Sequence, residues 1–359
     1  MLQEIELGLI RNEFENLKES RFLGEKLNAY CDTVLGWVSA LQEASAKSKY
    51  DKKIENMVNA QLWTSLNYLK GSTLNDVPHE MLFCLNAVLA DWKLSDSVLT
   101  TAQSQDRDFH INLSNPGDLI SKLIPKCDFP APLIRVAFPE LYRHHPLLNV
   151  ALYHEIGHYI DKEKGIVSAS LALNGEYMAL AGDEIRHFKS RGANIVKVEE
   201  SHRCELFADL LAAAYCGPSI IQFLEHIDLN DMTCETHPSL SKRRKITDKF
   251  LKGESDPLID LFGESLEIRG LGPLGIRYAI SAECERALTS FEPPTIANIA
   301  EVHGLFPSAW EFYKNYNKSD TRPSWQALSP LQAFDLVNDL TEKAIRNHDI
   351  IMRWNYVGP

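Results

Sequence analysis

The segment 146–164 most constrains what this chain can fold into, because it combines a complete helical pattern with two histidines at a fixed spacing. Pro146 suits the first turn of a helix, where its missing N–H costs nothing, and apolar residues then recur at helical intervals. Lys162 and Lys164 lie in the last turn and Gly165 follows them, which is how helices commonly end. The sequence therefore predicts a helix from Pro146 to Lys164, and the fold has to bury one of its faces.

Within this helix the chain reads His154-Glu155-Ile156-Gly157-His158. Histidines four residues apart lie one above the other on a helix face, so both imidazoles can reach one zinc ion. Glu155 lies beside that position, where its carboxylate can take a proton from a water held by the metal. The alternative is a pair of histidines on a purely structural helix. The spacing favours a zinc site with His154 and His158 as ligands and Glu155 as general base.

A catalytic zinc site needs a third protein ligand and an open fourth position. The metzincin arrangement would require glycine at 161 and histidine at 164, but the chain has Asp161 and Lys164 there. The candidate third ligand is Glu205, on a helix predicted from about Ser201 to Cys216 and ended by Gly217-Pro218. The competing interpretation makes Glu205 a surface ion-pairing residue.

Two neighbours of Glu205 matter for the same site. Asp209 projects from the same helix face one turn later, where its carboxylate can accept the other N–H of a ligand histidine and fix its tautomer. His202, three residues before Glu205, is a rival for the third ligand position.

Three motifs follow in order: His154-Glu155-x-x-His158, Glu205-x-x-Ala208-Asp209 and His237-Pro238-Ser239-x-x-x-Arg243. Together they resemble the motifs of gluzincin metallopeptidases, in particular HtpX-like and prenyl-protein endoproteases, over roughly residues 146–246. The resemblance implies a zincin-like core, a Zn²⁺ cofactor and hydrolysis of peptide bonds. It further implies that His237 stabilises the oxyanion and that Arg243 supports the architecture or electrostatics of the site. The chain lacks the amine-binding motifs of the major gluzincin aminopeptidases, which favours an endopeptidase.

Composition narrows the partners and the location. The formal net charge of −12 disfavours broad binding to nucleic acid or anionic lipid. No run of about 18 apolar residues predicts a membrane span. Seven scattered cysteines and an acidic N-terminal segment without a signal-peptide pattern favour a soluble, cytoplasmic protein with reduced thiols. No sequence feature indicates the oligomeric state.

The hydrophobic patterns predict a predominantly α-helical α+β fold in three parts. Residues 1–100 form an N-terminal helical region, 101–257 a zincin-like metallopeptidase core and 258–359 a C-terminal helical region. The best strand candidate is 133–138, hypothesised to be an edge strand that pairs with an extended substrate. Further patterns indicate a helix over 170–191 and a short strand over 195–198. We expect two helices to supply the metal ligands and a small sheet to border the cleft.

The function expected from these features is zinc-dependent cleavage of an intracellular protein or peptide. Two alternatives stay open. One is a zinc-stabilised regulatory or binding protein without turnover, and the other is a regulatory protease that cleaves a single partner.

Overall fold

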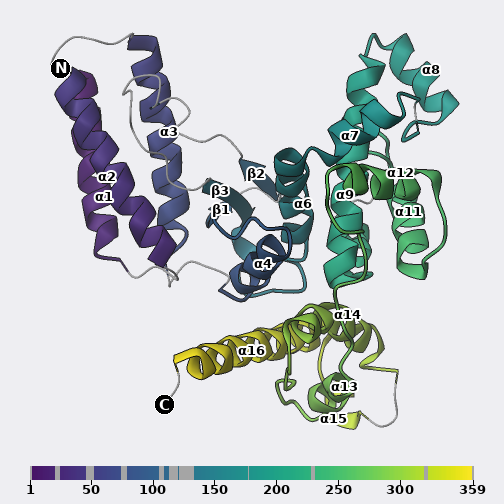
Figure 1. Cartoon of the computed structure of the whole chain (residues 1–359). Helices are drawn as coiled ribbons and strands as arrows, with labels where there is room; N and C mark the ends of the chain where they lie inside the picture. Colours follow the sequence, from purple (N-terminus) through teal and green to yellow (C-terminus); the bar gives the residue numbers. More distant parts are fainter. Residues whose placement is uncertain are drawn as a thin grey trace. The chain divides into compact units, whose positions relative to one another are not determined.

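The computed structural model of the chain is predominantly helical, at 69% helix, with a small three-stranded sheet among its described residues (Figure 1). This confirms the predicted α+β class. The structure describes residues 2–20, 25–45, 52–73, 79–104, 109–112, 120, 133–176, 178–227, 231–318 and 322–357.

The contacts divide the chain into two compact units. The first comprises Met1–Leu82 and Leu89–Arg143, and the second comprises Phe83–Val88 and His144–Pro359. The division into three parts drawn from the sequence stays a prediction.

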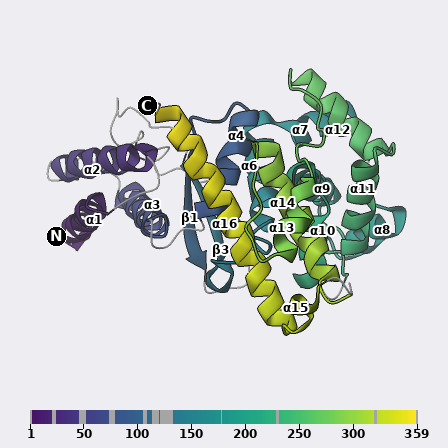
Figure 2. The same ribbon diagram turned by 90° about the horizontal axis from the view of Figure 1, so that it is seen from below.

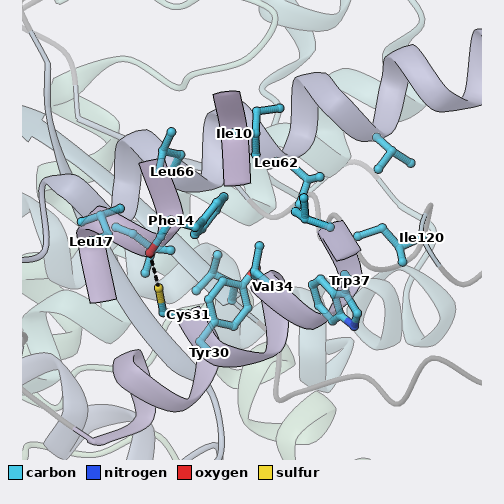
Figure 3. Close-up of a cluster of buried hydrophobic side chains, with 14 of the residues drawn as sticks. Ile10, Phe14, Leu17, Tyr30, Cys31, Val34, Trp37, Leu62, Leu66 and Ile120 are labelled. Atoms are coloured by element: carbon cyan, nitrogen blue, oxygen red, sulfur yellow. Dashed lines mark hydrogen bonds between the residues drawn. The ribbon is translucent and has the colours of Figure 1, made fainter. Parts of the chain in front are cut away.

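The first unit contains three long helices that share one apolar core: α1 (Leu2–Lys18), α2 (Glu25–Ser45) and α3 (Lys52–Lys70). Figure 3 shows Phe14 and Tyr30 in this core, with the Cys31 thiol donating to the carbonyl of Phe14 at 3.5 Å. Helix α4 (His79–Asp91) follows and contributes its residues 83–88 to the second unit.

The sheet of the first unit has the order β1-β3-β2, with β1 at Val98–Ser104, β2 at His110–Asn112 and β3 at Leu133–Pro139. Strand β3 pairs in parallel with β1 and antiparallel with β2, and the short 3₁₀ helix η1 (Glu140–Tyr142) follows it. The strand predicted at 133–138 is thus confirmed. Its predicted role as an edge strand is wrong, because β3 lies in the middle of the sheet, with β1 on one side and β2 on the other.

The second unit is helical among its described residues (Figures 1 and 2). Its elements are α6 (Ala151–Lys164), α7 (Ile166–Leu173), α8 (Gly182–Ser190), α9 (Ile195–Cys216), α10 (Ser219–Ile227), α11 (Leu240–Lys252), α12 (Pro257–Ile268), α13 (Ala282–Thr289), α14 (Ile299–Asn315), α15 (Pro323–Gln326) and α16 (Pro330–Val357). Helix α9 is almost wholly buried and packs against α6, α7, α11 and α14. It is therefore the centre of this unit.

Helix α6 begins later than its sequence pattern predicts, at Ala151 instead of Pro146. Residues 146–150 form turns, and contacts distant in sequence hold them there. The backbone N–H of Leu147 donates to the Asn338 side chain at 3.0 Å, and Trp310 donates to the carbonyl of Leu147 at 3.2 Å. The predicted end is confirmed, since Gly165 adopts a left-handed conformation directly after Lys164.

The helix predicted over 170–191 is wrong. The chain instead forms α7 and α8, and the described residues between them are not helical, because two buried side chains of α9 take backbone groups that a continuous helix would use. Glu199 accepts from the N–H groups of Met178 and Ala179 at 2.9 Å each. Arg203 donates to the carbonyls of Asn174 and Glu176 at 3.2 and 2.7 Å.

The short strand predicted over 195–198 is also wrong, since these residues form the first turn of α9. The side chain of Asn194 accepts from the backbone N–H groups of Val196 and Lys197, which caps the helix. This local cap outweighs the β preference of the branched residues.

No described helix combines the length and the apolar character that a membrane crossing requires. The six described cysteines are free thiols, and the seventh, Cys127, lies outside the described residues.

Candidate metal centre

A close approach of helices α6 and α9 creates the site. A Cβ atom built on Gly157 of α6 would lie 2.8 Å from the Cα and 3.0 Å from the Cβ of Ala208 on α9. Only glycine therefore fits at this crossing. Gly157 lies between the two histidines of α6, and Ala208 lies between Glu205 and Asp209 of α9, so the crossing point is also where the polar side chains meet.

His154, His158 and Glu205 present ligand atoms that all lie within 4.8 Å of one another. The Nε2 atoms of the two histidines are 3.1 Å apart. Glu205 places one carboxylate oxygen 3.2 Å from His154 Nε2 and the other 3.4 Å from His158 Nε2. His154 and Glu205 are buried, and His158 is partly exposed. This buried His-His-Glu group could hold a metal ion.

The hydrogen bonds of His154 direct a lone pair into this group. Its Nδ1 lies 2.9 Å from a carboxylate oxygen of Asp209, so that nitrogen carries the proton that Asp209 accepts. In the neutral imidazole Nε2 is then an acceptor that points at the carboxylate of Glu205. Glu205 Oε2 is itself buried, 3.2 Å from His154 Nε2 and 3.7 Å from Arg243 Nη2. Once His154 loses its second proton, two imidazole nitrogens and one carboxylate converge as electron-pair donors, a set that suits a metal ion.

Arg243, on α11, fixes the position of Asp209. Its guanidinium donates twice to the two carboxylate oxygens, from Nε and Nη2 at 2.7 Å each, and Asp209 is fully buried. Burial raises the pKa of Asp209, but the charge and hydrogen bonds of Arg243 outweigh it, so the pKa is lowered and the residue stays ionised. The pair holds His154 in one orientation. Asp209 and Arg243, both expected near the site from the sequence, thus pair with each other beside His154.

The same contacts set the protonation of the metal-free group. Burial lowers the pKa of His154, but hydrogen bonds to Asp209 and Glu205 outweigh burial and raise this pKa to about 10. Burial raises the pKa of Glu205, and the hydrogen bonds from His154 and His158 outweigh it and lower the pKa. Without a metal the group is therefore held by a proton shared among its members, which a cation has to displace.

Glu155 lies on α6 between His154 and His158 and is partly exposed. His237 lies in the loop before α11, with its side chain 53% exposed and its Nε2 3.5 Å from Glu205 Oε1. His237 lies next to the His-His-Glu group but is not part of it, since the atoms that lie within 4.8 Å of one another come from His154, His158 and Glu205. Among the described residues, no fourth protein ligand closes the site.

His202, the rival ligand, has a different place in the structure. It is fully buried, and its Nε2 lies 2.8 Å from the carbonyl oxygen of Cys234, in the loop that carries His237. That loop is also closed on itself, because the N–H of Cys234 donates to the carbonyl of His237 at 3.0 Å. His202 therefore anchors the His237 loop to α9.

Neither this anchor nor the Gly157–Ala208 crossing could be predicted from the sequence, since both depend on contacts between distant segments. A second attachment of the same loop was missed for the same reason. Glu184 of α8 accepts from Lys242 at 2.8 Å and from Thr233 at 3.3 Å, on the two sides of His237 in the chain.

A scan against protein-family models and searches of curated proteins and of solved structures found no match to this chain. The fold and the site therefore define the chain as a predominantly helical protein with a buried His-His-Glu group that could hold a metal ion.

Proposed function

We propose that this chain is a zinc-dependent endopeptidase of the gluzincin type, acting on an intracellular protein or peptide. The observation that carries the proposal is the convergence of His154, His158 and Glu205 on one point, with Glu155 on the same helix. Two imidazole nitrogens and one carboxylate, without a fourth protein ligand in the described structure, are the donor set of catalytic zinc sites rather than of closed structural ones.

Zinc held by His154, His158 and Glu205 would supply a Lewis acid that polarises the scissile carbonyl and makes a nearby water more acidic. Glu155 takes the proton of that water and passes it to the leaving amine. His237 donates a hydrogen bond to the oxygen on which negative charge develops, a role for which its exposed side chain at the edge of the group is suited. Asp209 and Arg243 keep His154 in the tautomer and orientation that a ligand needs.

The rival function is a zinc-stabilised binding protein without turnover. Such a site usually has four protein ligands, and no fourth one is present among the described His, Cys, Asp and Glu residues. A protease that cleaves one regulatory partner is a narrower form of the same proposal.

The test compares wild type with Glu155→Gln, using Glu163→Gln as a control because Glu163 is an exposed glutamate on the same helix. Each zinc-loaded protein is incubated with a peptide library made from cellular proteins, and new termini are read by mass spectrometry. We expect cleavage by wild type and Glu163→Gln, and none by Glu155→Gln at unchanged zinc content. Cleavage by Glu155→Gln would refute the mechanism. A zinc-loaded wild type that cleaves neither the library nor intact cellular proteins would favour the binding protein.

A further inference from the structure

A second candidate site lies in the C-terminal part of the second unit, in a half-open cavity of about 530 Å³. It is bordered by residues of α10, α13 and α14 and by Arg322, and none of the metal-group residues lines it. Its volume falls in the range of cavities that hold small organic ligands. The proposed peptidase reaction makes no use of it.

The floor of this cavity is apolar and aromatic. Phe312 and Cys284 are buried there, at 4% and 2% exposure, and Pro307 lies beside them. Tyr278 adds a second aromatic ring to the lining. A ligand that fills the cavity therefore needs an apolar portion.

The charges of the lining do not cancel. Arg322 is buried, and its guanidinium lies over the Phe312 ring at 4.4 Å and pairs with the carboxylate of Glu285. The lining contains a second carboxylate, Glu311, in addition to the paired Glu285. Glu311 Oε1 accepts from the neutral amide of Asn315 at 2.6 Å, which does not compensate its charge. Among the described lining residues, one arginine against two glutamates leaves one net negative charge.

We infer that this cavity binds an organic cation, namely an amine or guanidinium attached to an apolar body. The cationic head meets Glu311 and the outer side of Glu285 at the mouth, where both side chains are exposed. The apolar body leaves water against Phe312, Pro307 and Tyr278, and a cation close to these rings gains a further attraction. An anionic ligand of the same shape is repelled, because Arg322, the one arginine among the described lining residues, is already paired with Glu285.

The test uses three probes of one shape: 2-phenylethylamine, neutral 2-phenylethanol and anionic 3-phenylpropionate. Binding to the full chain is measured by saturation-transfer NMR and titration. We expect the amine to bind best and the carboxylate not to bind. A short peptide with adjacent phenylalanine and lysine side chains is titrated in parallel. The tighter of the two cations then shows whether the ligand is a free amine or a cationic side chain of a peptide.

Three variants locate the binding. Ala282→Trp fills the mouth at an exposed lining position and should abolish binding of the amine. Glu311→Gln should weaken it about threefold, as expected for one partly exposed charge pair. Glu264→Gln, on the exposed face of α12, makes the same charge change away from the cavity and should leave binding unchanged. Equal binding of amine and carboxylate, amine binding that survives both cavity variants, or no binding of either cation at millimolar concentration would each overturn the inference.

Discussion

Replacing Gly157 by alanine tests whether the helix crossing builds the metal group. The added Cβ would lie 2.8 Å from the Cα of Ala208, whereas carbon atoms in contact normally stay roughly 3.5–4.0 Å apart. Helices α6 and α9 would have to separate by roughly 1 Å to relieve the overlap. Metal sites tolerate ligand displacements of only about 0.2 Å. The substitution therefore moves His154 and His158 away from Glu205 by more than the metal allows.

Two opposing terms decide the effect on stability. Overpacking at a buried crossing costs roughly 1–3 kcal/mol, while exchanging glycine for alanine inside a helix gains about 1 kcal/mol. We expect a net loss of up to about 2 kcal/mol in the free energy of unfolding. We also expect zinc affinity to fall roughly 10- to 100-fold, which is the usual effect of removing groups that orient metal ligands. Gly263→Ala is the matched control, since Gly263 lies inside α12 with no atom within 4 Å of an added Cβ.

Both variants are measured by urea unfolding in the presence of a chelator and by zinc titration against a competing dye. Gly157→Ala should be destabilised and bind zinc weakly, whereas Gly263→Ala should be slightly stabilised and bind zinc like wild type. A Gly157→Ala protein that is as stable as Gly263→Ala and keeps wild-type zinc affinity would refute the packing argument.

Two further predictions concern the proton balance and the loop beside the metal group. The pKa of His154 is raised to about 10 without metal, so a cation has to displace one proton from it at neutral pH. Zinc affinity, measured by potentiometric titration, should therefore rise about tenfold per pH unit between pH 6 and 9. A zinc affinity that does not change above pH 7.5 would contradict this protonation state. His202→Ala removes the bond to the carbonyl of Cys234 and should leave zinc content unchanged, lower kcat roughly 10-fold with little change in KM, and speed maleimide labelling of the exposed Cys234 thiol. His202→Asn, which can donate the same bond, should restore part of both readouts, and zinc loss in His202→Ala would instead make His202 a ligand.

The features of the site that could be predicted from the sequence are those set within a single helix. The spacing of His154 and His158 is one turn, so a helix alone brings them together, and Glu205 and Asp209 are related in the same way. The glycines at 165 and 217 end their helices by their own conformational freedom.

The errors fall where distant residues decide the backbone. The helical pattern continues past Ser170, yet the buried Glu199 and Arg203 of α9 bind backbone groups of residues 174, 176, 178 and 179, which are not helical. The delayed start of α6 has the same kind of cause in Asn338 and Trp310. Such contacts connect residues that no local pattern relates, so periodicity cannot reveal them.

The most direct test of the central claim is the zinc content of wild type, Glu205→Ala and Glu200→Ala, purified in parallel without added metal and measured by elemental analysis. Glu200 is an exposed glutamate on the same helix, so its variant controls for loss of a negative charge near the site. We predict about one zinc per chain in wild type and Glu200→Ala, largely lost in Glu205→Ala. A wild-type protein that carries no zinc and takes none up when it is supplied would contradict the account, and the peptidase proposal would fall with it.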